Sequence, residues 1–149
     1  MGDGVDPVER EIVLPSARPG TNRLARGSAA MHLALGLGFG VGSLLTTSHL
    51  LRTGELPMTP FGFRSMAGGP FESVGVGSFA TLGVALSALC AADVLAGVWL
   101  WRSKRKGLNL ALLTSIPVLG LAVGFALPFL MIGVPIRVAL AWGARPSLR

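Results

Sequence analysis

The chain has 149 residues, of which 51% are hydrophobic and only 13% are charged, and its mean hydropathy is +0.64. A soluble domain carries about 25% charged residues, so this composition excludes an ordinary soluble protein and favours an integral membrane protein. The net charge of +6 comes from short clusters that flank apolar runs rather than from one basic face, which excludes nucleic acid as the partner.

Residues 1–28 are polar, and prolines interrupt them at positions 7, 15 and 19. Because proline removes a backbone donor and breaks a helix, we predict a mostly disordered cytoplasmic tail. The apolar run that follows is longer than the roughly 7–15 residues of a secretory signal core, which favours an anchor that is not cleaved.

The first predicted membrane span covers residues 29–51 and carries glycines at four alternate positions, namely Gly36, Gly38, Gly40 and Gly42. Glycines four residues apart leave a bare patch on one helix face, where another helix can approach closely. Gly36 and Gly40 also share a stripe with the polar residues His32, Ser43 and Thr47. We predict that this side of the helix packs against protein, either within the same chain or in a second molecule.

Two histidines, His32 and His49, lie near the two ends of this span, about 25 Å apart in a helix. They are too far apart to share a metal ion, and we expect each to lie at a membrane interface. For His49 the alternative is an acid–base pair with Glu55 or Glu72. The single cysteine, Cys90, excludes a disulfide within the chain and a cysteine-based metal site. We predict neither a metal nor a cofactor.

Residues 52–75 are expected to form a loop on the outer side, because prolines occur at positions 57, 60 and 70. The loop is unusually apolar, with phenylalanine at positions 61, 63 and 71. We predict that it lies along the membrane interface or caps the helical bundle. The alternative is a lid over a ligand site.

The second predicted span, residues 76–101, contains Asp93 and ends in Trp99 and Trp101. Four basic residues follow within five positions: Arg102, Lys104, Arg105 and Lys106. Cytoplasmic loops are rich in lysine and arginine, and tryptophan prefers the membrane interface. This cluster therefore predicts a cytoplasmic hairpin in contact with lipid headgroups, and it places the N-terminus inside.

Residues 108–144 are too long for one span and contain three prolines, so we predict a turn near residues 124–128 between spans at 108–126 and 128–144. Residues 145–149 then form a cytoplasmic tail. The predicted fold is an all-α, polytopic membrane four-helix bundle. A variant with three spans remains as the alternative, because the last span is short against the usual range of about 17–25 residues.

Asp93 and Arg137 are the charged residues inside the predicted spans, and four crossings bring them to a similar depth. An unpaired charge at the membrane centre costs about 2.5–3.5 kcal/mol, so we expect the two to pair. Three interpretations of Asp93 remain open: a structural pair that fixes helix register, a proton or ion site, and an acid solvated near the interface.

A long outer loop at 52–75, the stretch Gly-Val-Trp-Leu-Trp-Arg-Ser-Lys-Arg-Lys-Gly at 97–107 and a proline-broken terminal hairpin follow one another between residues 29 and 144. This layout resembles that of uncharacterised small four-span bacterial integral membrane proteins. The resemblance implies neither a reaction nor a substrate. We expect the chain to lie in the bacterial cytoplasmic (inner) membrane.

For function we predict a non-enzymatic accessory or structural subunit that packs through its glycine-rich faces against a second copy or a larger membrane complex. The alternative is a small transporter or channel subunit that uses Asp93 and Arg137 for protons or ions. A membrane enzyme acting on a lipid or quinone comes third. We identify no catalytic residue, since no serine lies in a Gly-x-Ser-x-Gly nucleophile elbow.

Overall fold

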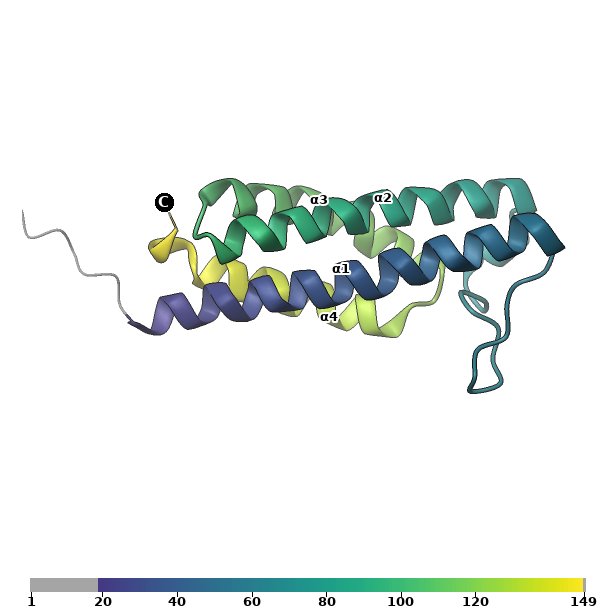
Figure 1. The fold of residues 1–149 in the computed structure, drawn as a ribbon, viewed down its shortest axis with the longest axis horizontal. Helices are drawn as coiled ribbons and strands as arrows, with labels where there is room; N and C mark the ends of the chain where they lie inside the picture. Colours follow the sequence, from purple (N-terminus) through teal and green to yellow (C-terminus); the bar gives the residue numbers. More distant parts are fainter. Residues whose placement is uncertain (1–18, 149) are drawn as a thin grey trace, which may run out of the picture.

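The computed structural model describes residues 19–148, and this part of the chain is all-helical, without β-strands. Four α-helices alternate in direction and form a bundle (Figure 1). They are α1 (Pro19–Thr53), α2 (Val76–Trp101), α3 (Arg105–Gly124) and α4 (Pro128–Gly143), with short 3-10 turns η1 (Pro70–Ser73) and η2 (Arg145–Ser147). Each helix packs against the next, and α4 packs back onto α1. The predicted all-α four-helix fold is confirmed.

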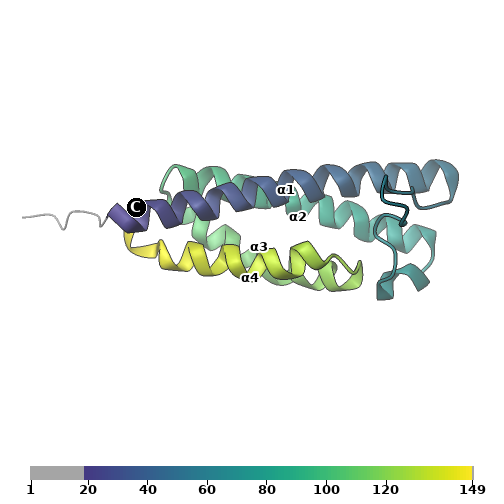
Figure 2. The ribbon, with the colours of Figure 1, turned by 90° about the horizontal axis from the view of Figure 1, so that it is seen from below.

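Three helical segments, Arg23–Thr53, Val76–Trp101 and Arg105–Gly124, are long and apolar enough to cross a membrane, whereas α4 has only 16 residues. This is compatible with a small membrane protein. At about 1.5 Å per residue, α2 is about 39 Å long and α3 about 30 Å. As a result α1 and α2 extend beyond the turn between α3 and α4 (Figure 2).

The first helix begins at Pro19 rather than at residue 29, so the expectation of a disordered tail is wrong for residues 19–28. Proline suits the first position of a helix, because its missing N–H would have no intrahelical partner there. Ala25 on this extension and the adjoining Ala29 are buried in one cluster with Ala144 and Leu148 from the end of the chain. The remainder of the predicted tail, residues 1–18, lies outside the described residues.

The hairpins that follow α2 and α3 are closed by the same kind of turn. Ser103 (φ 55°) follows α2 and Ala126 (φ 49°) follows α3, both in the left-handed region. In each turn the next N–H donates to a carbonyl five residues back, from Lys104 to Trp99 at 2.9 Å and from Leu127 to Ala122 at 2.8 Å. This is the Schellman arrangement, which ends a helix abruptly. The second turn lies at the predicted position, between Gly124 and Pro128.

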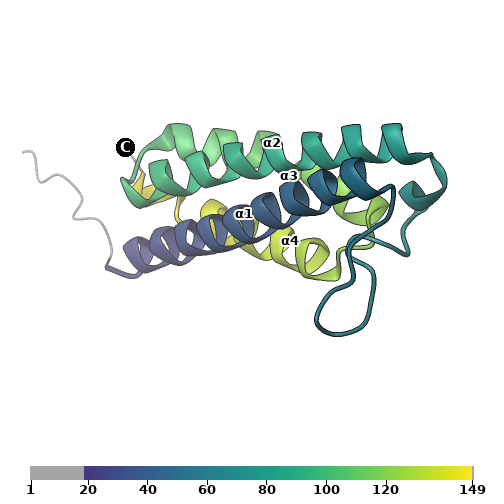
Figure 3. The ribbon, with the colours of Figure 1, turned by 45° about the vertical axis from the view of Figure 1, so that its right-hand side comes forward.

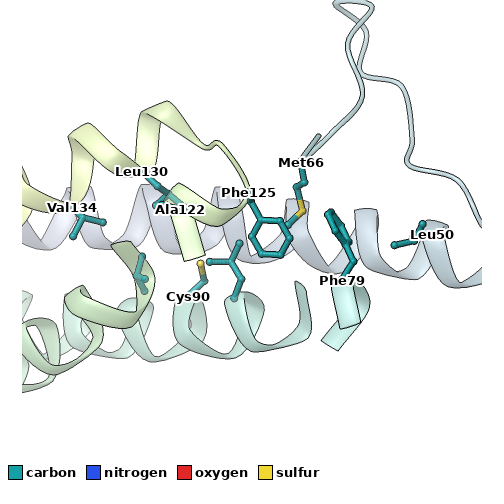
Figure 4. Packing of buried hydrophobic residues seen from close by; sticks show 10 residues of the cluster. Leu50, Met66, Phe79, Cys90, Ala122, Phe125, Leu130 and Val134 are labelled. Carbon is teal, nitrogen blue, oxygen red and sulfur yellow. The ribbon is translucent and has the colours of Figure 1, made fainter. Parts of the chain in front are cut away.

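The core consists of two clusters along the bundle. The aromatic cluster lies at the loop end, where α1 ends and α2 begins, and Figure 4 shows the ring of Phe125 next to Met66 and Phe79. Phe125 is fully buried and meets Phe79 and Phe71 edge-on, with centroids 5.0 Å and 5.2 Å away. The alanine cluster lies at the terminal end, where α1 begins and α4 ends. It consists of Ala25, Ala29, Ala96, Leu100, Leu108, Ala111, Ala141, Ala144 and Leu148.

The loop of residues 54–75 covers the loop end of the bundle. Met66 is buried there, and Phe71 packs against the aromatic cluster. Gly69 approaches the carbonyl of Gly124 so closely that a Cβ at position 69 would overlap it. The loop therefore caps the bundle, as predicted. Its tip, with Phe61 85% exposed, projects away from the helices (Figure 3).

Candidate functional site at the buried ion pair

Asp93 of α2 and Arg137 of α4 lie in contact in the interior of the bundle. The distance from Arg137 Nη2 to Asp93 Oδ2 is 2.6 Å, and the side chains of Arg137 and Asp93 are 0% and 1% exposed. The interpretation of Asp93 as an acid solvated near the interface is therefore wrong. Because α2 and α4 are not neighbours in the ring of helices, this contact runs across the centre of the bundle.

Thr114 of α3 holds the other oxygen of the carboxylate. Its hydroxyl lies 2.7 Å from Asp93 Oδ1 and 3.0 Å from the carbonyl oxygen of Leu110 in its own helix. A hydroxyl has a single proton to donate. We assign that proton to Asp93, because a charged acceptor at the shorter distance forms the stronger bond. This bond adds α3 to the helices that meet at the site.

Ser28 and His32 bring α1 to the same site. Ser28 Oγ donates to the main-chain carbonyl of Arg137 at 3.0 Å, and the carbonyl of Ser28 lies 2.8 Å from His32 Nδ1. A carbonyl only accepts, so Nδ1 carries a proton and Nε2 of the neutral ring is a bare acceptor. The side chain of His32 is fully buried among the helices. Gly97, one turn from Asp93, makes room for it, since a Cβ there would lie 3.0 Å from His32 Cβ.

Several polar atoms of this cluster have no hydrogen-bond partner. Within the described residues they are His32 Nε2, Asp93 Oδ2 and the nitrogens Nε, Nη1 and Nη2 of Arg137. Arg137 Nη2 and Asp93 Oδ2 contact each other as the ion pair at 2.6 Å. Each buried polar group without a partner costs about 1–3 kcal/mol. The site thus combines a neutralised charge pair with donors and an acceptor that are not used.

The four predicted packing glycines fall into two pairs with different surroundings. A Cβ at Gly36 would lie 2.9 Å from the carbonyl oxygen of Cys90 on α2, and one at Gly40 would lie 3.0 Å from Cys90 Cβ. By contrast, no atom of the described part of the chain lies within 4 Å of a Cβ at Gly38 or Gly42. The first pair is therefore used for packing within the chain, and the second remains open.

The predicted headgroup cluster, Arg102, Lys104, Arg105 and Lys106, is exposed at the turn between α2 and α3. Two tryptophans, Trp101 and Trp142, are half-exposed at the same end, and the guanidinium of Arg145 lies 5.3 Å from the ring centroid of Trp142. This combination of basic and aromatic side chains is typical of a membrane interface.

The other candidates form no site in the described part of the chain. His49 is exposed and makes no ion pair with Glu55 or Glu72 among residues 23–148. Cys90 is a buried free thiol. No group of three residues that could hold a metal ion occurs within the described residues.

Sequence reasoning found the two charged residues but missed Thr114 and Ser28. A threonine in a helix usually bonds to its own helix, so its spacing gives no sign of a partner 21 residues away. Ser28 fell outside the predicted span. For His32 a signal existed, since it shares the stripe of Gly36 and Gly40 that faces α2.

Comparison of the chain with protein-family models, with curated proteins and with solved structures finds no match. Function is therefore inferred from the chain's own residues and their geometry.

Proposed function

We propose that this chain is a small multi-pass protein of the bacterial inner membrane that acts as a non-enzymatic accessory or structural subunit. The observation that carries the proposal is the enclosure of the Asp93–Arg137 pair, in which neither side chain is more than 1% exposed. A catalytic or transporting residue must be reached by its substrate. An ion pair that fixes helix register needs no such access, and its attraction is stronger when water is excluded. Thr114, Ser28 and the pair itself join all four helices at this point.

The distribution of basic residues supports an orientation with the terminal end in the cytoplasm. The start of α1, the turn between α2 and α3 and the end of α4 lie together at that end (Figure 1). The exposed cluster Arg102, Lys104, Arg105 and Lys106 is there, as is Arg145. Cytoplasmic segments next to membrane spans are enriched in lysine and arginine. In this orientation α4 crosses as a fourth, short span, and the loop 54–75 faces outward.

The open glycine pair supports contact with a second copy or with a larger membrane complex. Gly38 and Gly42 lie one turn apart and leave the backbone of α1 bare, next to the exposed side chains of Leu37, Val41 and Leu45. Bare glycine faces allow close packing between membrane helices. Replacing both glycines by leucine should weaken self-association or co-purification in mild detergent, while unchanged association would remove this part of the proposal.

The subunit proposal is tested by ion flux in liposomes. Purified wild type should give no more proton or cation flux than empty liposomes, and Asp93→Asn should lower the yield of folded protein. Glu55→Gln removes an exposed carboxylate and serves as the matched control. A flux driven by a pH gradient that disappears in a well-folded Asp93→Asn variant would overturn the proposal.

The second candidate, a small transporter or channel subunit for protons or ions, is supported by the unused hydrogen-bonding atoms of the site. Among residues 19–148, Arg137 Nε and Nη1 are donors without an acceptor, and His32 Nε2 is an acceptor without a donor. His32→Gln distinguishes the two candidates, because it removes the imidazole ring and leaves Asp93 and Arg137 in place. Loss of flux with normal helicity would favour transport.

A further inference from the structure

We propose that a cavity beneath the loop 54–75 binds the headgroup of a zwitterionic phospholipid that carries a phosphate and a primary ammonium group. The cavity has a volume of about 240 Å³ and lies between the end of α1, the loop and the first turn of α2. None of its residues belongs to the buried ion-pair site. The inference rests on the proposed membrane location, and it assigns to the loop the predicted role of a lid in addition to that of a cap.

The lining of the cavity divides into an apolar floor and a charged rim. Leu50 and Phe79 are buried and form the floor, while Glu55, Arg64 and Glu72 are exposed and form the rim. This division matches an amphiphile, whose polar group meets the rim and whose first methylene groups meet the floor. The volume is below the roughly 300–1,000 Å³ of sites for drug-sized ligands, which suits a headgroup rather than a whole lipid.

The three charged side chains of the rim do not neutralise one another. Among the described residues no carboxylate lies within ion-pair distance of Arg64. Glu72 is held in place by the N–H of Gly68, which donates to its Oε2 at 2.9 Å, and Arg64 is fixed at the backbone by a bridge to Met58. Both signs of charge are thus presented separately, as a zwitterion requires.

The first turn of α2 adds to the anion-binding side of the cavity. Val76, its first residue, lines the cavity, and this turn contains neither a capping side chain nor an acidic residue. Its free N–H groups and the positive end of the helix dipole favour a phosphate, as does the guanidinium of Arg64. The carboxylates of Glu55 and Glu72 favour the ammonium group.

Helix lengths place the cavity at the depth of lipid headgroups. The hydrocarbon layer is about 30 Å thick, which α3 matches, while α2 is about 39 Å long. With Trp101 at one interface, the first turns of α2 extend about 9 Å beyond the other side of the hydrocarbon layer. The cavity borders these turns, so its polar rim lies among headgroups and its floor lies nearer the acyl chains.

Headgroup chemistry selects one class of lipid. Phosphatidylethanolamine offers a phosphate to Arg64 and an N–H-bearing ammonium to the carboxylates. Phosphatidylcholine has no N–H to donate, and phosphatidylglycerol has no cation for Glu55 and Glu72. The predicted order of affinity is therefore phosphatidylethanolamine first, with the other two lower.

The test is a lipid titration of the full chain in mild detergent, followed by native mass spectrometry. The probes are the three phospholipids with identical acyl chains and, separately, glycerophosphoethanolamine without acyl chains. Arg64→Gln and the double variant Glu55→Gln/Glu72→Gln should each weaken phosphatidylethanolamine binding about fivefold. Arg52→Gln, an exposed arginine outside the cavity lining, should leave it unchanged.

Equal binding of the three lipids, unaffected by the rim variants, would overturn the proposal and indicate unspecific boundary lipid. Equal binding of glycerophosphoethanolamine would overturn the lipid as the source and indicate a soluble zwitterion. Retained helicity of each variant shows that a loss of binding is not a loss of fold. Failure of the membrane proposal is seen separately, as release of the chain from membranes by alkaline carbonate.

Discussion

The two ends of the bundle are held together in different ways. Toward the terminal end the helices approach closely through alanines, and directional polar contacts centred on Asp93 and Arg137 join them. At the loop end the interior is filled by large aromatic side chains, and Phe125 lies between two further aromatic rings beneath the loop. An ion pair or hydrogen bond requires a partner of the right charge and geometry, whereas the stability of aromatic packing depends on how well the side chains fill the interior. The first region should therefore respond to charge balance and the second to side-chain size.

The largest effect is expected when one member of the ion pair is removed. Arg137→Met leaves the Asp93 carboxylate buried without a counter-charge, and breaking a buried pair in this way costs about 3–5 kcal/mol. The free energy of unfolding would be measured by denaturant titration of helicity in detergent micelles. The double variant Asp93→Leu/Arg137→Met removes both charges and should recover much of the loss. If single and double variants are equally unstable, charge balance does not hold this end together.

The ion pair also shows how far the sequence alone can lead. Asp93 and Arg137 were paired correctly because they are the charged residues inside apolar runs, and the cost of an isolated charge leaves few alternatives. The same reasoning could not supply Thr114 or Ser28, whose hydroxyls have local carbonyls as competing partners. Charge predicts a partner at long range, while a hydroxyl does not.

The helix boundaries that local sequence determines were predicted, whereas those that depend on distant contacts were not. Composition predicted α2, the turn before Pro128 and the cap formed by the loop. It did not predict that α1 begins at Pro19, because the early turns are stabilised by contacts with Ala144 and Leu148, more than 100 residues away. Likewise, the close approach of Gly69 to Gly124 depends on tertiary packing that no local pattern encodes.

At the loop end, Phe125→Ala should lower the free energy of unfolding by about 3 kcal/mol, because it removes the ring at the centre of the aromatic cluster. The loop should also become more sensitive to proteolysis, since Phe71 loses its packing partner. Phe129→Ala, at a ring that is 76% exposed in the same hairpin, is the matched control and should change little. Equal losses in the two variants would contradict a core centred on Phe125.

A smaller effect, with opposite signs, is expected for the two glycine pairs of α1. Gly36→Ala brings a Cβ to 2.8 Å from Val94 and should destabilise the bundle by about 1–3 kcal/mol. Gly38→Ala meets nothing and should be neutral or slightly stabilising, because alanine favours helix. Thermal unfolding of both variants in the same detergent makes the comparison. A loss at Gly38 that depends on protein concentration would instead show that this face is occupied in an oligomer.

The smallest change in the free energy of unfolding is expected at the two Schellman turns, one at each end of the bundle. Ser103 and Ala126 adopt positive φ, which costs a residue with a Cβ about 1 kcal/mol or more, so replacement of either by glycine should stabilise the bundle by about 1 kcal/mol. Gly54→Ala is the reverse control, since Gly54 has φ 76° and open space around it, and it should be destabilising. Because Ser103 lies at the terminal end and Ala126 at the loop end, similar gains would mean that backbone strain is stored equally in both. A gain in stability at Ala126 alone would mean that the backbone at Ser103 is not strained. The two ends of the bundle would then differ in backbone strain as well as in the packing of their side chains.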